Sequence, residues 1–173
     1  SLKECRDIID PIINKFSGRI FHTDGDSIIA EFDSPVGATK AGVEFQKSIK
    51  DRDLTEDKNP KLSWRVGIHL DDIIIEGDNI YGNGVNIAAR LESQSPVGEI
   101  LISDLVRQQI NNKIEEKIYP LGKIELKNIS NNFEVFSLLG DGKSKIKNVS
   151  NKNLNKKPKF AILPFANTSK DED

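Results

Sequence analysis

The chain has 173 residues, 25 of them basic and 27 acidic, and a formal net charge of −2. This length suits one domain of ordinary size with an appendage. The single cysteine, Cys5, excludes an intrachain disulfide and a cysteine-based zinc site and is typical of a cytoplasmic protein. No apolar run approaches the roughly 20 residues that span a bilayer, and no signal-peptide pattern is present, so we expect no membrane segment.

The first half of the chain predicts a helix, a hairpin and a second helix, over residues 4–16, 19–32 and 34–49. Pro11 is expected to delay the start of the first helix, and Gly18 to end it. The dipeptide Asp24-Gly25 supplies the positive φ angles of a tight hairpin turn.

The second half begins with the strongest strand pattern. Apolar and polar residues alternate over 62–70, and with a turn at Asp71-Asp72 and a return over 73–75 they predict a second hairpin. A loop and a helix follow over 77–92. The later elements are a strand at 100–102, a helix capped by Ser103-Asp104, and strands near 117–119 and 133–138. Two hairpins with helices between them predict an α+β fold with helices on one face of the sheet.

The helix that begins near Val85 carries an unusual polar pair. Most of its residues are apolar, but Asn86 and Arg90 are spaced i, i+4 and share one side. Arginine offers a planar fork of donors and asparagine can donate or accept, so the pair suits a phosphate or a sugar. The same spacing also fits the solvent-facing stripe of an amphipathic helix.

Charge is distributed unevenly along the chain. Residues 1–140 hold 17 basic and 23 acidic side chains, whereas residues 142–159 hold seven lysines and no acid. The basic stretch is typical of a solvated linker. A nucleic-acid-binding arm is the alternative, but aromatic residues are not interleaved with the lysines and the main domain is acidic, so we expect no nucleic-acid partner.

Four motifs in order resemble class III nucleotide cyclases. The most specific covers residues 79–90 and is similar to the family's D-I-x-G-x-x-V-N-x-A-x-R. The others are found at 18–26, 64–69 and 98–103, with a further Leu-Lys-Asn at 126–128. The similarity covers about residues 1–139 and is closest to bacterial cyclases that continue into a TolB-like or tetratricopeptide region.

This resemblance implies an α+β, ferredoxin-like cyclase core, an antiparallel sheet with helices packed on it. The implied domains are a cyclase domain at 1–140, a Lys/Asn-rich linker at 141–159 and the start of a TolB-like domain at 160–173. The family's first strand, which carries a metal-binding aspartate in a motif of the type F-A-D-I-x-G, is expected to precede Ser1. We therefore expect residues 1–173 alone to be inactive.

The activity implied is conversion of ATP to 3′,5′-cyclic AMP and pyrophosphate in signal transduction, with two Mg²⁺ or Mn²⁺ ions per site. By resemblance, Asp26 binds metal, Asn86 orients the ribose and Arg90 stabilises charge on the α-phosphate. Carboxylate oxygen is a suitable ligand for such hard cations. Family members form homodimers with shared active sites, so a homodimer is implied here too.

Three further positions are matched with substrate binding. Lys127 matches a lysine that contacts the terminal phosphates, although an ordinary surface lysine would look the same. His22 and Asn79 occupy the base-reading positions, where adenylyl cyclases have lysine and aspartate and guanylyl cyclases have glutamate and cysteine. Because of this departure, the sequence does not decide whether the substrate is ATP or GTP. It also leaves two alternatives: a guanylate cyclase, and a catalytically silent nucleotide-binding regulatory domain.

Overall fold

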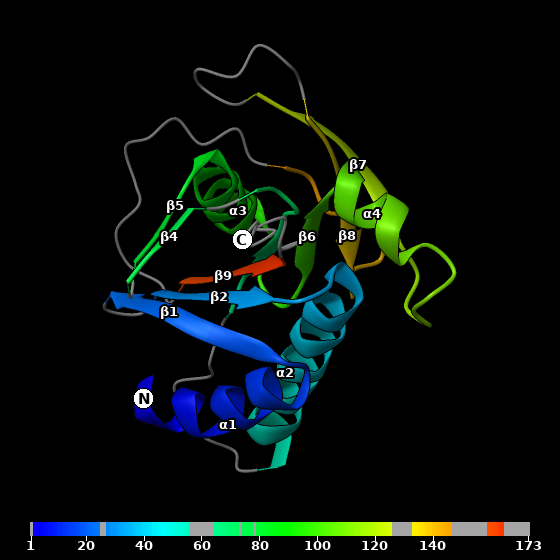
Figure 1. Cartoon of the computed structure of the whole chain (residues 1–173). Coiled ribbons are helices and arrows are strands. Elements are labelled where there is room, and N and C mark those ends of the chain that lie inside the picture. Colours follow the sequence, from blue (N-terminus) through cyan, green and yellow to red (C-terminus); the bar gives the residue numbers. More distant parts are fainter. Residues whose placement is uncertain are drawn as a thin grey trace.

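The computed structural model describes residues 2–24, 27–55, 64–72, 74–77, 79–125, 133–146 and 159–164 (Figure 1). The helices are α1 (Leu2–Lys15), α2 (Pro35–Thr55), α3 (Asn83–Gln94) and α4 (Asp104–Ile110). The strands are β1 (Gly18–Asp24), β2 (Ser27–Phe32), β3 (Val66–Ile68), β4 (Ile74–Glu76), β5 (Asn79–Tyr81), β6 (Ile100–Ser103), β7 (Tyr119–Ile124), β8 (Phe133–Leu138) and β9 (Lys159–Pro164). Within these ranges no helix is both long and apolar enough to cross a membrane.

One seven-stranded sheet organises the domain, in the order β1-β2-β9-β3-β6-β8-β7. The pairs at its two sides are antiparallel: β1 with β2 at one side, and β6 with β8 and β8 with β7 at the other. Across the centre, β2, β9, β3 and β6 run parallel. The predicted α+β fold with a packed sheet is confirmed, and the antiparallel pairing expected of it is confined to the two sides.

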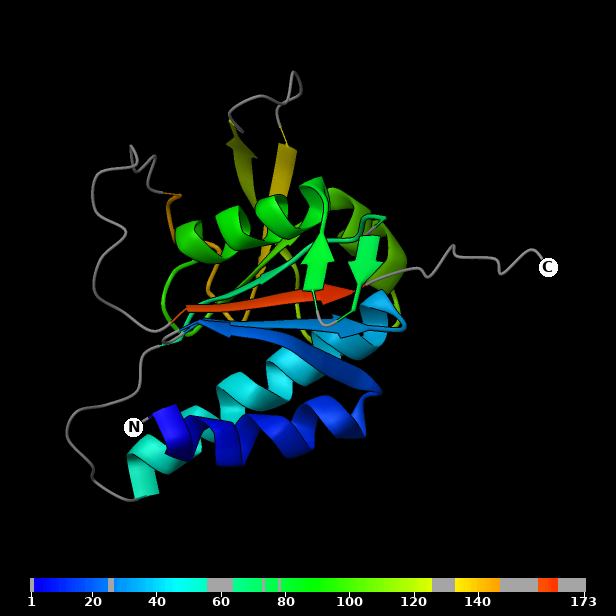
Figure 2. The same ribbon diagram turned by 60° about the vertical axis from the view of Figure 1, so that its left-hand side comes forward.

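Helices cover both faces of the sheet, so the expectation of helices on one face was wrong. α3 lies on the face of the sheet opposite α1 and α2, as Figure 2 shows. α4 packs on α2 and belongs to the same side as α1 and α2. The reason is visible in β6, which is buried on both sides. Ile100 and Ile102 pack with the α1–α2 side, whereas Leu101 joins Ile87 and Leu91 of α3 in a second apolar cluster.

The start of the chain departs from expectation at two residues. α1 continues through Pro11, because its apolar side, including the buried Ile9 and Ile13, packs on α2 and offsets the lost backbone hydrogen bond. Ser17, not Gly18, takes the positive φ of 60° after the helix. Gly18 instead begins β1, where a Cβ would come within 2.5 Å of the Phe32 ring.

The first hairpin is confirmed and the second is not. β1 and β2 pair antiparallel with Asp24 opposite Ser27. β3 does not turn back on itself; β4 pairs instead with β5 in a separate two-stranded ribbon. β3 is buried on both faces and pairs with β6 and β9. The alternation of apolar and polar residues around it therefore does not mark a strand with one solvent-exposed face.

β9 is supplied by the far end of the chain, yet it lies in the middle of the sheet between β2 and β3 (Figure 1). Its register places Ala161 opposite both Ile29 and Gly67. The sequence assigns this stretch to the start of a TolB-like domain, and that assignment stays a prediction. Residues 147–158 of the expected linker, and residues 165–173, lie outside the described residues.

Gly67 sets the distance between the sheet and α3. A Cβ at this position would lie 2.6 Å from the Ala88 carbonyl oxygen and would also collide with the Glu92 amide nitrogen. Both obstacles are helix backbone, which cannot move aside as a flexible side chain can. The absence of a side chain at Gly67 therefore allows α3 to pack directly on β3.

We expect Gly67→Ala to lower the free energy of unfolding by about 1–3 kcal/mol, since the added methyl must displace α3. Gly37→Ala in α2 is the matched control. Its Cβ would meet its nearest neighbours at 3.2 and 3.3 Å, and alanine is the better helix former. Urea unfolding monitored by circular dichroism measures both changes. Equal stability of the two variants would contradict the close contact at Gly67.

Candidate functional site

α3 presents the predicted polar pair on its solvent side. Ile87, Ala88 and Leu91 are buried against the sheet, while Asn86 is exposed and Arg90 is partly exposed. The two side chains are separated by four residues, hence about one helical turn. Asn86 projects from the face opposite the core, whereas Arg90 lies beside it with its Nε atom buried. Their predicted placement on one side of the helix is thus observed. Their roles toward a ligand remain predictions.

The segment 65–71 fixes α3 along its length, running antiparallel to the helix. At the C-terminal part of α3, Arg65 Nε lies 3.5 Å from the buried Glu92 Oε1. Gly67 contacts the helix backbone at Ala88, as described above. At the first turn, a Cβ on Gly84 would lie 2.6 Å from the Asp71 Cβ, so Asp71 packs closely on the start of the helix.

His69 lies between these contacts and is buried, with 2% of its surface exposed. Its Nδ1 is 2.8 Å from Ser103 Oγ, and its Nε2 is 3.7 Å from Asp71 Oδ2. The Phe133 ring meets the imidazole edge to face at 6.0 Å between centroids. Burial lowers the pKa of His69 below its usual value of 6.5, and the nearby Asp71 carboxylate opposes that shift only in part.

The two positions predicted to read the base come from strands that contact each other. His22 belongs to β1, where it is paired with Ile29 next to a bulge, and Asn79 begins β5 opposite Glu76. β5 contacts β1, so the structure brings these two strands together. The side chains of His22 and Asn79, and the whole of Asp26 and Lys127, lie outside the described residues.

The described part of the chain contains no group of three His, Cys, Asp or Glu side chains able to bind a metal ion. The predicted metal ligand Asp26 lies outside the described residues, between β1 and β2 in the sequence. A carboxylate there is a hard oxygen donor of the kind that Mg²⁺ or Mn²⁺ requires. The donor chemistry of Asp26 therefore fits the implied ions.

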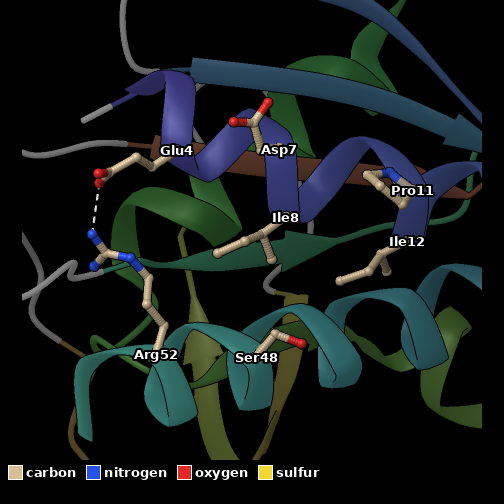
Figure 3. A pocket seen from close by; sticks show the side chains of 7 residues that line it. All are labelled: Glu4, Asp7, Ile8, Pro11, Ile12, Ser48 and Arg52. Carbon is tan, nitrogen blue, oxygen red and sulfur yellow. Dashed lines mark hydrogen bonds and ion pairs between the residues drawn. The ribbon is translucent and has the colours of Figure 1, made fainter. Parts of the chain in front are cut away.

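A groove of about 590 Å³ lies between α1 and α2, on the face of the sheet opposite α3 (Figure 3). Its one arginine, Arg52, donates to Glu4 at 2.6 Å and to Asp53 at 2.9 Å. These carboxylates neutralise the guanidinium, so this groove is a poor anion site. It is separate from the surface that carries Asn86 and Arg90.

Sequence reasoning missed the contacts that support α3. The sequence places His69 at the end of the motif at 64–69 without a role of its own, and predicts Ser103 as a helix cap. Ser103 does precede α4, but it makes no side-chain cap and its hydroxyl pairs with His69. The available signal was that His69 is the one histidine in the alternating stretch 62–70.

The fold and the polar pair on α3 agree with the family that the chain matches. Residues 1–140 match the family described as the adenylate and guanylate cyclase catalytic domain, and the chain belongs to this family. The ferredoxin-like cyclase class predicted from the motifs is therefore confirmed, while a TolB-like continuation is not shown.

Among its relatives is "Putative adenylate cyclase 3" of Rhizobium meliloti, 30% identical over 97% of this chain and 29% of that protein. The chain thus spans less than a third of that relative. Among solved structures, an adenylate/guanylate cyclase/hydrolase from Silicibacter pomeroyi is 34% identical, with a TM-score of 0.72 over 80% of this chain and 83% of that one. The adenylyl cyclase CyaB from P. aeruginosa, 21% identical, shares the fold with a TM-score of 0.61 over 80% of each chain.

The lowered pKa of His69 predicts a loss of stability in mild acid. Above pH 6.5 the ring is neutral in both states, but as the pH falls below 6.5 the unfolded chain binds the proton first. The free energy of unfolding should therefore fall until the pH reaches the pKa of the folded state. Urea unfolding at about pH 7.5 and about pH 5.5 measures this fall.

His69→Gln removes this titration but leaves every other acid and base in place. The difference in unfolding free energy between the two pH values should be smaller in the variant than in the natural protein. An identical acid sensitivity in both proteins would show that His69 is not the responsible group.

Proposed function

We propose that this domain converts ATP to 3′,5′-cyclic AMP and pyrophosphate within a longer signalling protein. The observation that carries the proposal is the pair Asn86 and Arg90, one turn apart on the solvent side of α3, in a chain of the cyclase family. The relative from Rhizobium meliloti is named as a putative adenylate cyclase, which supports ATP as the substrate.

The reaction needs fixed donors where negative charge accumulates. The ribose 3′-oxygen attacks the α-phosphorus, a new P–O bond forms, and the bond to the β-phosphate oxygen breaks to release pyrophosphate. Arg90 would donate to the α-phosphate oxygens as their charge grows, and its planar fork suits two of them. Asn86, one turn earlier, would hold the ribose so that the 3′-oxygen approaches in line.

Asp26 would supply a carboxylate to the divalent ions, two per site, and Lys127 would contact the terminal phosphates. When bound, Mg²⁺ or Mn²⁺ neutralises triphosphate charge and lowers the pKa of the attacking hydroxyl. Because Asn86 is exposed in the single chain, the site would be enclosed by a second copy. A homodimer with shared sites fits this exposure.

His22 and Asn79 favour the second candidate, a silent domain that binds nucleotide for regulation. Neither residue carries the fixed charge that the family uses to read a purine. They would still form neutral hydrogen bonds to adenine, with His22 donating to a ring nitrogen and Asn79 accepting from the amino group. Guanylate cyclase activity is the remaining alternative.

Arg90→Ala in the full-length protein should lower cyclic AMP formation about a hundredfold or more, because a donor to transition-state charge is removed. Arg6→Ala is the matched control, since Arg6 pairs with Asp10 on the distant α1. Product formation from ATP and GTP is measured by chromatography with Mg²⁺ and with Mn²⁺. Cyclic GMP as the main product would overturn ATP as the substrate.

A folded protein that forms neither product but binds an ATP analogue in calorimetry would support the silent domain instead. Absence of both activity and binding would overturn both candidates.

The double variant His22→Lys with Asn79→Asp should raise the preference for ATP over GTP about tenfold, since charged hydrogen bonds discriminate more strongly than neutral ones. The ratio of kcat/KM for the two nucleotides measures this. The exposed substitutions Asn14→Lys and Asn111→Asp add the same pair of charges away from α3, and should leave the ratio unchanged. A double variant with an unaltered ratio would remove both positions from base recognition.

A further inference from the structure

His69 is a buried polar group for which the proposed chemistry has no use. It lies just after β3, on the face of the sheet that α3 covers, as Gly67 does two residues earlier. Its two ring nitrogens face two different partners, Ser103 Oγ and Asp71 Oδ2. The Asp71 carboxylate favours the tautomer with hydrogen on Nε2, and Nδ1 then accepts from the Ser103 hydroxyl.

Asp71 connects this histidine to the first turn of α3. Its Oδ1 accepts from the Asp72 amide at 2.8 Å, and its Oδ2 faces His69. On the other side, its Cβ packs against the α-carbon of Gly84, the second residue of α3. The two carboxylate oxygens thus face different neighbours; the 3.7 Å separation from Nε2 is an electrostatic contact longer than a hydrogen bond, and the Asp71 side chain is 39% exposed.

The first turn of α3 needs such support. Gly82, at its N-cap, makes no side-chain hydrogen bond to the helix, so the usual capping oxygen is lacking there. A carboxylate beside the positive end of a 12-residue helix is favourable. The next residues along the helix are those of the candidate site, with Asn86 two positions beyond Gly84.

We infer that His69 is a positioning residue for the Asn86–Arg90 pair, because it fixes the Asp71 carboxylate against Gly84 and so sets where the first turn of α3 lies. Its kinetic consequence rests on the proposed cyclase function, but the contact itself does not. A histidine that only filled space beside Phe133 would be equally well replaced by any neutral side chain of similar size.

Two amide variants separate these roles. In His69→Gln the amide nitrogen can take the place of Nε2 and donate toward Asp71. The shorter side chain of His69→Asn reaches the place of Nδ1, next to Ser103, but not Asp71. Both variants are neutral and polar, so they match each other in charge and differ in which partner they retain.

We expect His69→Asn to lower kcat about tenfold with KM changed less than about twofold, because a small displacement of a transition-state donor costs rate more than affinity. His69→Gln should keep most of the rate. Hydrogen exchange of the full-length protein should be about tenfold faster over residues 86–88, whose amides are the first to donate within α3, in the asparagine variant, and close to natural in the glutamine variant.

Asp71→Ala supplies an independent check. It should speed exchange in the first turn of α3 as much as His69→Asn, and the two changes combined should add nothing further, because they interrupt the same connection.

Equal exchange rates over residues 86–88 in the two His69 variants would overturn the inference, whatever the kinetics. If the natural protein forms no cyclic nucleotide, only the proposed function fails, and the exchange comparison still decides the positioning role. Faster exchange in His69→Asn without any loss of kcat in an active enzyme would overturn the inference as well.

Discussion

The direct packing of α3 on β3 at Gly67 is the contact on which the rest of this domain depends. Without a side chain at that position, the helix backbone at Ala88 and Glu92 reaches the sheet itself. Gly67 sets the distance between the helix and the sheet, Arg65 contacts the C-terminal part of the helix, and Asp71 contacts its first turn. A rigid support of this kind is what a site needs when its side chains must meet a ligand within fractions of an ångström.

The sequence predicts most of what is local. The hairpin of β1 and β2 follows from strand pattern and turn chemistry, although Asp24, predicted as a turn residue, is the last residue of β1. The placement of Asn86 and Arg90 on one side of α3 follows from helical periodicity. The family itself follows from the ordered motifs. These features depend on residues near one another in the chain, so a short window contains the physical cause. The roles of Asp26 and Lys127 toward a ligand come only from the resemblance.

Features that depend on distant partners could not be predicted in the same way. The path of α1 through Pro11 is decided by burial against α2, which no local propensity reveals. β3 alternates like a hairpin strand but is covered on both faces, and its neighbours come from remote segments. Ser103 has the composition of a helix cap, yet the buried His69 is the partner of its hydroxyl. Pairings of this kind require the tertiary fold.

The position of β9 has a consequence for how the chain acquires its fold during synthesis. β2 and β3 each bond to β9, so the middle of the sheet closes only after a segment far downstream has been made. At a synthesis rate of about 5–20 residues per second, that interval is on the order of seconds, long compared with helix formation. Throughout it, the two strands offer unpaired backbone edges to any other chain nearby. The nascent domain should therefore be a client of chaperones that bind extended segments until Lys159–Pro164 have emerged.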